Sequence, residues 1–263
     1  MSVANPPFSA VGAPASQRVQ SRTPLMSSPK RLARLAGVLY LLVGIFGGFA
    51  QGFVEPKMYV AGDAAKTAAN VVANSELVRL GVVADLLDPT IFVFLALLLY
   101  VLLKHVNQSV ARAMLVLVVI SAAIECLNTV FEFEGLQVAT SGAYATALGA
   151  SGSNALVLLL LDTQHFGLLI AQIFFGLWLA PLGYLAYRSG LFSKPLGVVL
   201  VVGAACYLVD LLSLFLVPDF GKAIHGLVTI PSAIAEIWMV GYLLVVGVRN
   251  PKGAGPAPAA GEG

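Results

Sequence analysis

The chain has 263 residues, of which 59% are hydrophobic and only 11% are charged, and its formal net charge is +2. Soluble domains are about 45–50% apolar and about 25% charged, so this composition excludes a water-soluble globular protein. The small net charge does not indicate nucleic-acid binding, and Cys126 and Cys206 lie far apart without the spacing of a metal or redox pair.

Low-complexity segments occur at both ends of the chain. Residues 1–29 are rich in Pro, Ser, Ala and Gln without apolar periodicity, and residues 250–263 are rich in Gly, Ala and Pro. Such segments bury too little apolar surface to offset the entropy lost on folding, so we expect both to be disordered cytoplasmic tails. The membrane domain is therefore predicted to span residues 30–249.

Six apolar segments lie between these tails, each long enough to cross a bilayer, which requires about 20 apolar residues. They predict an all-α, polytopic membrane protein, a bundle of six transmembrane helices at residues 33–54, 80–103, 112–133, 163–187, 195–217 and 227–248. The first segment follows Arg31 and Arg34, as a signal peptide would, but its apolar core exceeds the about 7–15 residues of a signal sequence. We therefore expect it to be retained as a helix.

The distribution of basic residues predicts the orientation of these helices. With the N-terminus inside, most of the Lys and Arg residues lie on the inner side: Arg18, Arg22, Lys30, Arg31, Arg34, Lys104, Arg112, Arg188, Lys194, Arg249 and Lys252. The outer side has only Lys57, Lys66, Arg79 and Lys222. By the positive-inside rule, the protein is expected to be a multi-pass protein of the cell membrane with both termini in the cytoplasm.

Two of the predicted outer connections are long. Residues 55–79 alternate small and polar side chains and predict a short surface helix that begins near Asp63, a favourable N-cap residue. Residues 134–162 contain no Lys or Arg and are predicted as a loop that ends in apolar residues. Asp162 and His165 would then lie at the outer mouth of the bundle.

Gly44, Gly48 and Gly52 form two overlapping GxxxG units on one face of the first predicted helix. Small residues at this spacing let a second helix approach closely, so this face is predicted to be a packing surface. The partner is expected to be a helix of the same chain, with a second copy of the chain in a homo-oligomer as the alternative. The lipid bilayer is the other predicted partner.

Acidic residues inside apolar helices are the main clue to function, because a charge near the bilayer centre costs about 2.5–3.5 kcal/mol on insertion scales. In the second helix, Asp85 and Asp88 precede Pro89, which removes a backbone hydrogen bond and frees the carbonyl of Asp85. Freed backbone groups beside carboxylates are typical of ion and substrate sites in broken helices. An ordinary kink with solvated aspartates is the alternative.

Polar residues also share faces of the third and fourth helices. Glu125, Asn128 and Glu132 follow at spacings of three and four, so their common face must look into the bundle. Asp162 and His165 lie three apart on one helical face, a spacing at which the carboxylate could orient or charge the imidazole. A capping or interfacial role for this pair is the alternative.

The predicted topology puts these residues on the outer side of the bundle, with Asp210 and Glu236 from the last two helices. No Lys or Arg lies deep enough to neutralise them, except Arg79 at the outer end of the second helix. We therefore expect one outward-facing polar pocket that binds or transports a cation, a proton or a small polar or lipidic molecule. Its candidate residues are Asp85, Asp88, Glu125, Asn128, Glu132, Asp162, His165, Asp210 and Glu236.

Enzymatic and structural roles are the alternatives to binding or transport. A membrane-embedded, metal-assisted hydrolase would need His165 and His225 with Asp162 or other carboxylates around one metal ion. The sequence has no HExxH, Walker A or GxSxG motif, so it favours a role without catalysis and predicts no cofactor. In a structural or accessory subunit, the acidic groups would serve only packing and insertion.

Four stretches of the chain resemble a known family: RLARLAGVLYLLVGIFGGFA, GDAAKTAANVVANSELVRLGVVADLL, LLLYVLLKHVNQSVA and LDTQHFGLLIAQIFFGLWLAPLGYLAYRSGLFSKPLGVVLVVGAACYLVD. They are similar to the bacterial membrane proteins called domain of unknown function 4386, over residues 31–248. The resemblance implies a six-helix integral membrane protein and no particular activity. It covers, without implying a role for them, Asp63, Arg79, Asp85, Asp162, His165, Arg188, Gly190 and Asp210.

Overall fold

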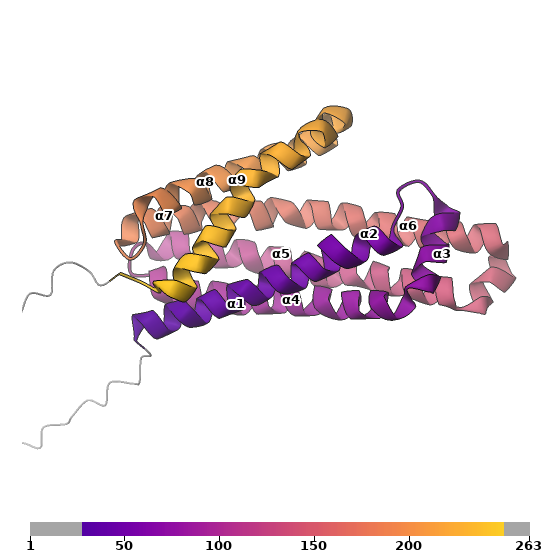
Figure 1. The fold of residues 1–263 in the computed structure, drawn as a ribbon, viewed down its shortest axis with the longest axis horizontal. Coiled ribbons are helices and arrows are strands. Elements are labelled where there is room, and N and C mark those ends of the chain that lie inside the picture. The colour runs from indigo at the N-terminus through magenta and orange to yellow at the C-terminus, as the bar shows by residue number, and fades with distance from the viewer. Residues whose placement is uncertain (1–27, 250–263) are drawn as a thin grey trace, which may run out of the picture.

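The computed structural model describes residues 28–249, which are helical almost throughout (Figure 1). Six helical stretches in this part of the chain are long and apolar enough to cross a membrane: Pro29–Met58, Ser75–Leu103, Gln108–Thr140, Gly142–Ser189, Lys194–Leu216 and Pro218–Val245. The protein is therefore an all-α, multi-pass membrane protein, and the predicted six-helix bundle is confirmed. The two segments predicted to be disordered lie outside the described residues, except for Ser28 and Pro29. Pro29 is helical, since α1 begins there.

Local breaks divide these stretches into shorter elements. In chain order they are α1 (Pro29–Phe49), the π-helical turn η1 (Ala50–Val54), α2 (Glu55–Met58), α3 (Ala64–Ala73), α4 (Ser75–Leu103), α5 (Gln108–Thr140), α6 (Gly142–Leu177), α7 (Leu179–Ser189), α8 (Lys194–Leu216) and α9 (Pro218–Val245). The surface helix predicted within residues 55–79 is confirmed as α3. Asp63 caps it, since its Oδ1 accepts a hydrogen bond from the Lys66 amide at 2.9 Å.

The prediction of a loop at residues 134–162 is wrong, because α5 and α6 are separated only by Ser141. The segment contains many Ala and Leu residues, which favour helix. Its small residues also let the two helices pack closely, so that a Cβ on Gly135 would lie 3.2 Å from Leu161. Within this segment only Gly149, with a φ of 71°, departs from helical geometry inside α6.

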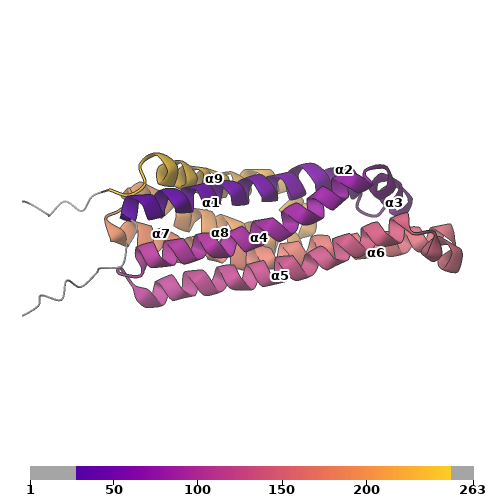
Figure 2. The ribbon, with the colours of Figure 1, turned by 90° about the horizontal axis from the view of Figure 1, so that it is seen from below.

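The long helices form a ring. Figure 2 shows α4 between α1 and α5. Beyond α5, the ring continues with α6, α8 and α9, each of which packs on the next, and α9 closes it by packing on α1. Figure 1 shows both ends of the described chain at one end of the bundle and α3 at the other. These are called the terminal end and the far end below.

An aromatic core fills the ring towards the terminal end. Trp178, between α6 and α7, is fully buried and meets Tyr40 and Phe92 edge-on, with ring centroids 5.6 and 4.9 Å apart. Each such pair adds about 0.5–1.5 kcal/mol beyond the burial of its area. The helix breaks here because Pro181 has no amide to bond the carbonyl of Leu177.

The hairpin of α7 and α8 depends on two facing glycines. A Cβ on Gly183 would lie 2.6 Å from the carbonyl oxygen of Gly197, and a Cβ on Gly197 would lie 2.7 Å from that of Gly183. Backbone atoms cannot move aside as a flexible side chain can, so the two helices must separate to admit a methyl group.

Gly183→Ala and Gly197→Ala are each expected to destabilise the protein by about 1–3 kcal/mol, because they overpack this contact. Thermal unfolding in detergent measures the loss as a fall in Tm. Gly226→Ala is the matched control, because a Cβ there has no neighbour within 4 Å. A Tm at or above that of the unchanged protein in both hairpin variants would contradict the contact.

Candidate functional site

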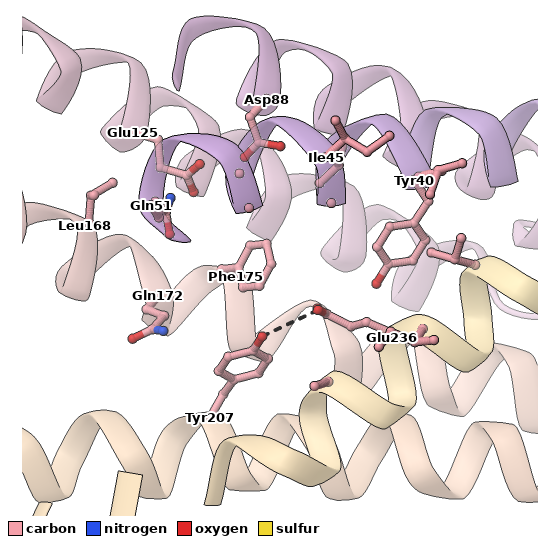
Figure 3. Close-up of a pocket in the computed structure, with 18 of the residues that line it drawn as sticks. Tyr40, Ile45, Gln51, Asp88, Glu125, Leu168, Gln172, Phe175, Tyr207 and Glu236 are labelled. Atoms are coloured by element: carbon pink, nitrogen blue, oxygen red, sulfur yellow. Dashed lines mark hydrogen bonds between the residues drawn. The ribbon is translucent and has the colours of Figure 1, made fainter. Parts of the chain in front are cut away.

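A cavity of about 600 Å³ lies inside the ring, between the aromatic core and the far end. Among the described residues, no Lys or Arg lines it. Four of the predicted site residues do: Asp88, Glu125, His165 and Glu236. Figure 3 shows Asp88 and Glu125 on one side of the cavity, with Glu236 and the unpredicted Tyr207 on the other.

Asp88 points into this cavity from the middle of α4 with one oxygen unpartnered. Only 7% of the residue is exposed, and Oδ1 has no hydrogen-bond partner among the described residues. The carboxyl group lies against Gly47 of α1, where a Cβ would be 3.4 Å from Oδ2. A buried carboxyl group without a partner costs free energy, so this position is typical of a group that binds something from outside the chain.

Glu125 and Asn128 share a face of α5 but have different surroundings. Ser121 donates a hydrogen bond to Glu125 Oε1 at 2.6 Å, and the Asn128 side-chain amide donates to the backbone oxygen of Gln164 at 3.0 Å. Asn128 also lies directly on Gly167, where an added Cβ would overlap it. Glu125 therefore lines the cavity, whereas Asn128 joins α5 to α6.

Three further polar atoms around the cavity lack a hydrogen-bond partner within residues 28–249: Tyr40 Oη, Gln172 Oε1 and Glu236 Oε1. The second oxygen of Glu236 accepts a long hydrogen bond from the Tyr207 hydroxyl, at 3.5 Å (Figure 3). Phe175 meets Tyr207 edge-on, with ring centroids 5.6 Å apart. The cavity thus combines unpartnered acceptors with aromatic rings, the surroundings that favour a cation.

Two side-chain pairs, here called the clasp, join α6 to the end of the first membrane stretch. His165 Nδ1 lies 2.7 Å from Glu55 Oε1, and the Tyr59 hydroxyl donates to Asp162 Oδ1 at 2.5 Å. Tyr59 also stacks on His165, with ring centroids 5.3 Å apart. The π-helical turn η1 lies directly before Glu55, and such turns are frequent at functional sites. Because Glu55 and His165 both line the cavity, the clasp bounds its far end.

The clasp corrects the prediction that Asp162 orients His165. The two residues do share a face of α6, but the segment from Glu55 to Tyr59 packs on that face and supplies a separate partner for each. Sequence reasoning missed both partners; an acidic residue at the end of the first apolar segment was the signal for Glu55. Partial burial and the bond to Asp162 raise the pKa of Tyr59 above its ordinary value, so the phenol remains a donor at physiological pH.

The other predicted acidic residues do not line this cavity. Asp85 and Glu132 are close neighbours between α4 and α5, outside the cavity lining. Asp210 is only 1% exposed, and its two oxygens lie 2.9 and 3.0 Å from His225 Nδ1 of α9. The sequence places these residues at a similar depth, but the packing of neighbouring helices gives them different surroundings: Asp210 meets His225, whereas both oxygens of Glu132 lack a hydrogen-bond partner among the described residues.

The geometry does not support a metal site. Within residues 28–249, no three His, Cys, Asp or Glu side chains are grouped so that they could hold a metal ion. The candidate histidines have separate carboxylate partners, since His165 meets Glu55 and His225 meets Asp210. A zinc site needs at least three protein ligands around one ion, so a metal-assisted hydrolase gains no support.

The expectation that a helix of the same chain packs on Gly44, Gly48 and Gly52 is also wrong. A Cβ on any of the three would have no neighbour within 4 Å. The close glycine contacts of α1 occur at Gly37, which lies on the same face but nearer the terminal end, and at Gly47, which lies on a neighbouring face. Gly44 and Gly48 instead line the cavity.

Tyr59→Phe is expected to lower the free energy of unfolding by about 1–3 kcal/mol, because it leaves the Asp162 carboxyl group without its donor. Amide hydrogen exchange of residues 50–60 should also become faster, because this hydroxyl joins them to α6. Tyr144→Phe, at an exposed tyrosine of α6, is the control. Unchanged exchange in Tyr59→Phe would contradict a structural role for the clasp.

Comparison with known proteins places the cavity inside a family domain. A family model described as Domain of unknown function (DUF4386) matches residues 35–247, which include every residue of the cavity lining and of the clasp. Searches of curated proteins and of solved structures gave no match. Because the family model covers most of the chain, this protein belongs to the DUF4386 family of membrane proteins.

Proposed function

We propose that this protein binds a small organic cation in the cavity. The observation that carries the proposal is Asp88, a buried carboxyl group with an unpartnered oxygen. It faces a cavity that also contains Glu125 and Glu236 and, among the described residues, no Lys or Arg. A ligand with a positive charge and N–H donors would supply the hydrogen bonds that the chain does not.

The size and walls of the cavity favour an organic cation over a metal ion or a proton. Its volume of about 600 Å³ falls in the range of about 300–1,000 Å³ that is usual for small-molecule sites. Tyr40, Phe175 and Tyr207 offer aromatic rings, and a cation over such a ring gains about 0.5–2 kcal/mol. A metal ion would gain little from these apolar surfaces, because its protein ligands are oxygen, nitrogen or sulfur atoms.

Transport is the second candidate function, and the depth of the cavity supports it. Asp88 lies about 24 Å along α4 from Lys104, and Glu55 lies about 32 Å along the first stretch from Arg34. Since the hydrocarbon core is about 30 Å thick, the cavity would extend from inside the membrane to the far boundary. Accumulation of radiolabelled benzylammonium in proteoliposomes would distinguish a carrier from a protein that only binds.

We also propose that both termini are cytoplasmic and that the clasp faces the outside of the cell membrane. The support is the concentration of basic residues at the terminal end, in α1, the α4–α5 turn and the α7–α8 turn. The far end has fewer basic residues, including Lys66 of α3.

Single cysteines test this orientation in cells, after Cys126 and Cys206 have been replaced by Ala. Lys66→Cys is expected to react with a membrane-impermeant maleimide added to intact cells, because it is exposed at the far end. Lys104→Cys, exposed at the terminal end, should react only after the cells are opened. The opposite pattern of labelling would reverse the proposed orientation.

Asp88→Asn is expected to abolish the response of the protein to benzylammonium. Saturation at about 100 times Kd should stabilise the unchanged protein by about 2.7 kcal/mol, seen as a rise in Tm. Benzyl alcohol, which has the same ring without the charge, should cause no such rise. Glu134→Gln, at an exposed carboxylate of the same bundle, is the control and should respond like the unchanged protein.

The same variant has an independent signature in the absence of ligand. Because Asp88→Asn removes an unpartnered acidic group from the apolar interior, the ligand-free variant should be at least as stable as the unchanged protein. An equal response to benzylammonium and benzyl alcohol, or to benzylammonium with and without Asp88, would refute the cation site.

A further inference from the structure

One wall of the cavity is apolar and open to the outside of the bundle. It consists of α1 residues, including Leu41 and Ile45, and α9 residues, including Ile237 and Val240. Ile45 is 53% exposed and Ile237 is 72% exposed, so in a membrane both would contact lipid while also lining the cavity. On this side, between α1 and α9, the cavity therefore opens laterally to the surface of the bundle.

Glycines set where this opening begins. At Gly37, α1 and α9 touch, since an added Cβ would be 2.9 Å from Leu243 Cβ. About two and three turns further along α1, at Gly44 and Gly48, an added Cβ would meet nothing within 4 Å. Figure 1 shows α9 crossing α1 near the terminal end and diverging from it towards the far end. The two glycines thus leave a slit that larger side chains would fill.

A buried acid lies directly behind this slit. Gly47, between the two slit glycines, lies against the Asp88 carboxyl group, at 3.4 Å from an added Cβ to Oδ2. Asp88 is 7% exposed and its Oδ1 is unpartnered among the described residues. An apolar slit open to lipid therefore leads inward to an unsatisfied acceptor.

On the basis of the proposed function, we propose that the ligand is a single-chain alkylammonium amphiphile, with its ammonium group at Asp88 and its alkyl chain in the slit at Gly44 and Gly48. Charge selects the headgroup: an anionic phosphate would face Asp88, Glu125 and Glu236 with no Lys or Arg in the described lining. The width of the slit favours a ligand with a single alkyl chain, because only two glycines on one helix widen it. The slit adjoins a cavity of about 600 Å³.

The test compares two cations in nanodiscs of a zwitterionic phospholipid: decylammonium, which has a long chain, and benzylammonium, which fits the cavity alone. Gly44→Leu and Gly48→Leu are expected to weaken decylammonium binding about tenfold or more, because leucine occupies the slit. Benzylammonium binding should fall by a smaller factor than decylammonium binding, because benzylammonium has no alkyl chain to place in the slit. Gly52→Leu is the matched control, because Gly52 belongs to the same stripe in open space but does not line the cavity.

A second measurement uses the unchanged protein and so does not depend on the folding of a variant. Decylammonium with a diazirine at the end of its chain should label α1 and α9 near Ile45 and Ile237, and excess unlabelled decylammonium should suppress the labelling. Labelling spread evenly over the lipid-facing helices, without competition, would overturn the slit.

The outcomes separate this inference from the proposed function. If benzylammonium binds and decylammonium binds equally well to Gly44→Leu and Gly48→Leu, the cation site stands and the slit is refuted. If neither cation binds the unchanged protein, the proposed function itself fails. If a zwitterionic or anionic phospholipid displaces decylammonium, the slit binds phospholipid and the inference is overturned. If native mass spectrometry shows that Gly44→Leu dissociates a dimer without affecting binding, the slit is occupied by a second copy of the chain, and the inference is again overturned.

Discussion

The burial of acidic side chains in a ring of apolar helices, with no Lys or Arg lining its cavity in the described chain, is the constraint on which this structure depends. In hydrocarbon, each polar group must find its partner within the protein or in a bound molecule. Ser121 serves Glu125, and His225 serves Asp210. Asp88 keeps an oxygen without such a partner in the part of the chain that the structure describes, and the cavity lies beside it.

The same small residue has opposite consequences along α1. At Gly37 and Gly47 the missing side chain admits a neighbour, first the backbone of α9 and then the Asp88 carboxyl group. At Gly44 and Gly48 nothing takes up the space, and the cavity reaches the surface. In membranes, small residues usually bring helices together, but Gly37, Gly44 and Gly48 share a face of α1, so here their effect depends on how far along α1 they lie before α9 diverges.

The bundle also differs between its two halves. Towards the terminal end, Trp178 and its aromatic neighbours fill the ring. Towards the far end, the clasp joins α6 to the segment after η1 through Glu55 and Tyr59. Both halves therefore have an apolar core, and the polar contacts of the clasp add to the second core at the far end.

The sequence by itself determined the fold class and the six membrane stretches. The hydropathy and length of each apolar segment can be read locally, and the thickness of the bilayer sets the length that a spanning helix needs. It also identified the buried acids, since a carboxyl group in an apolar helix stands out in any arrangement. It did not predict the helical connection around Ser141, whose stability comes from the packing of α5 on α6. Only the tertiary structure decided that Asp162 meets Tyr59 rather than His165, and that Asp88 faces a cavity while Asp210 does not. A sequence specifies the depth of a residue and its angle on its own helix, but the neighbour at that angle depends on how all the helices pack together.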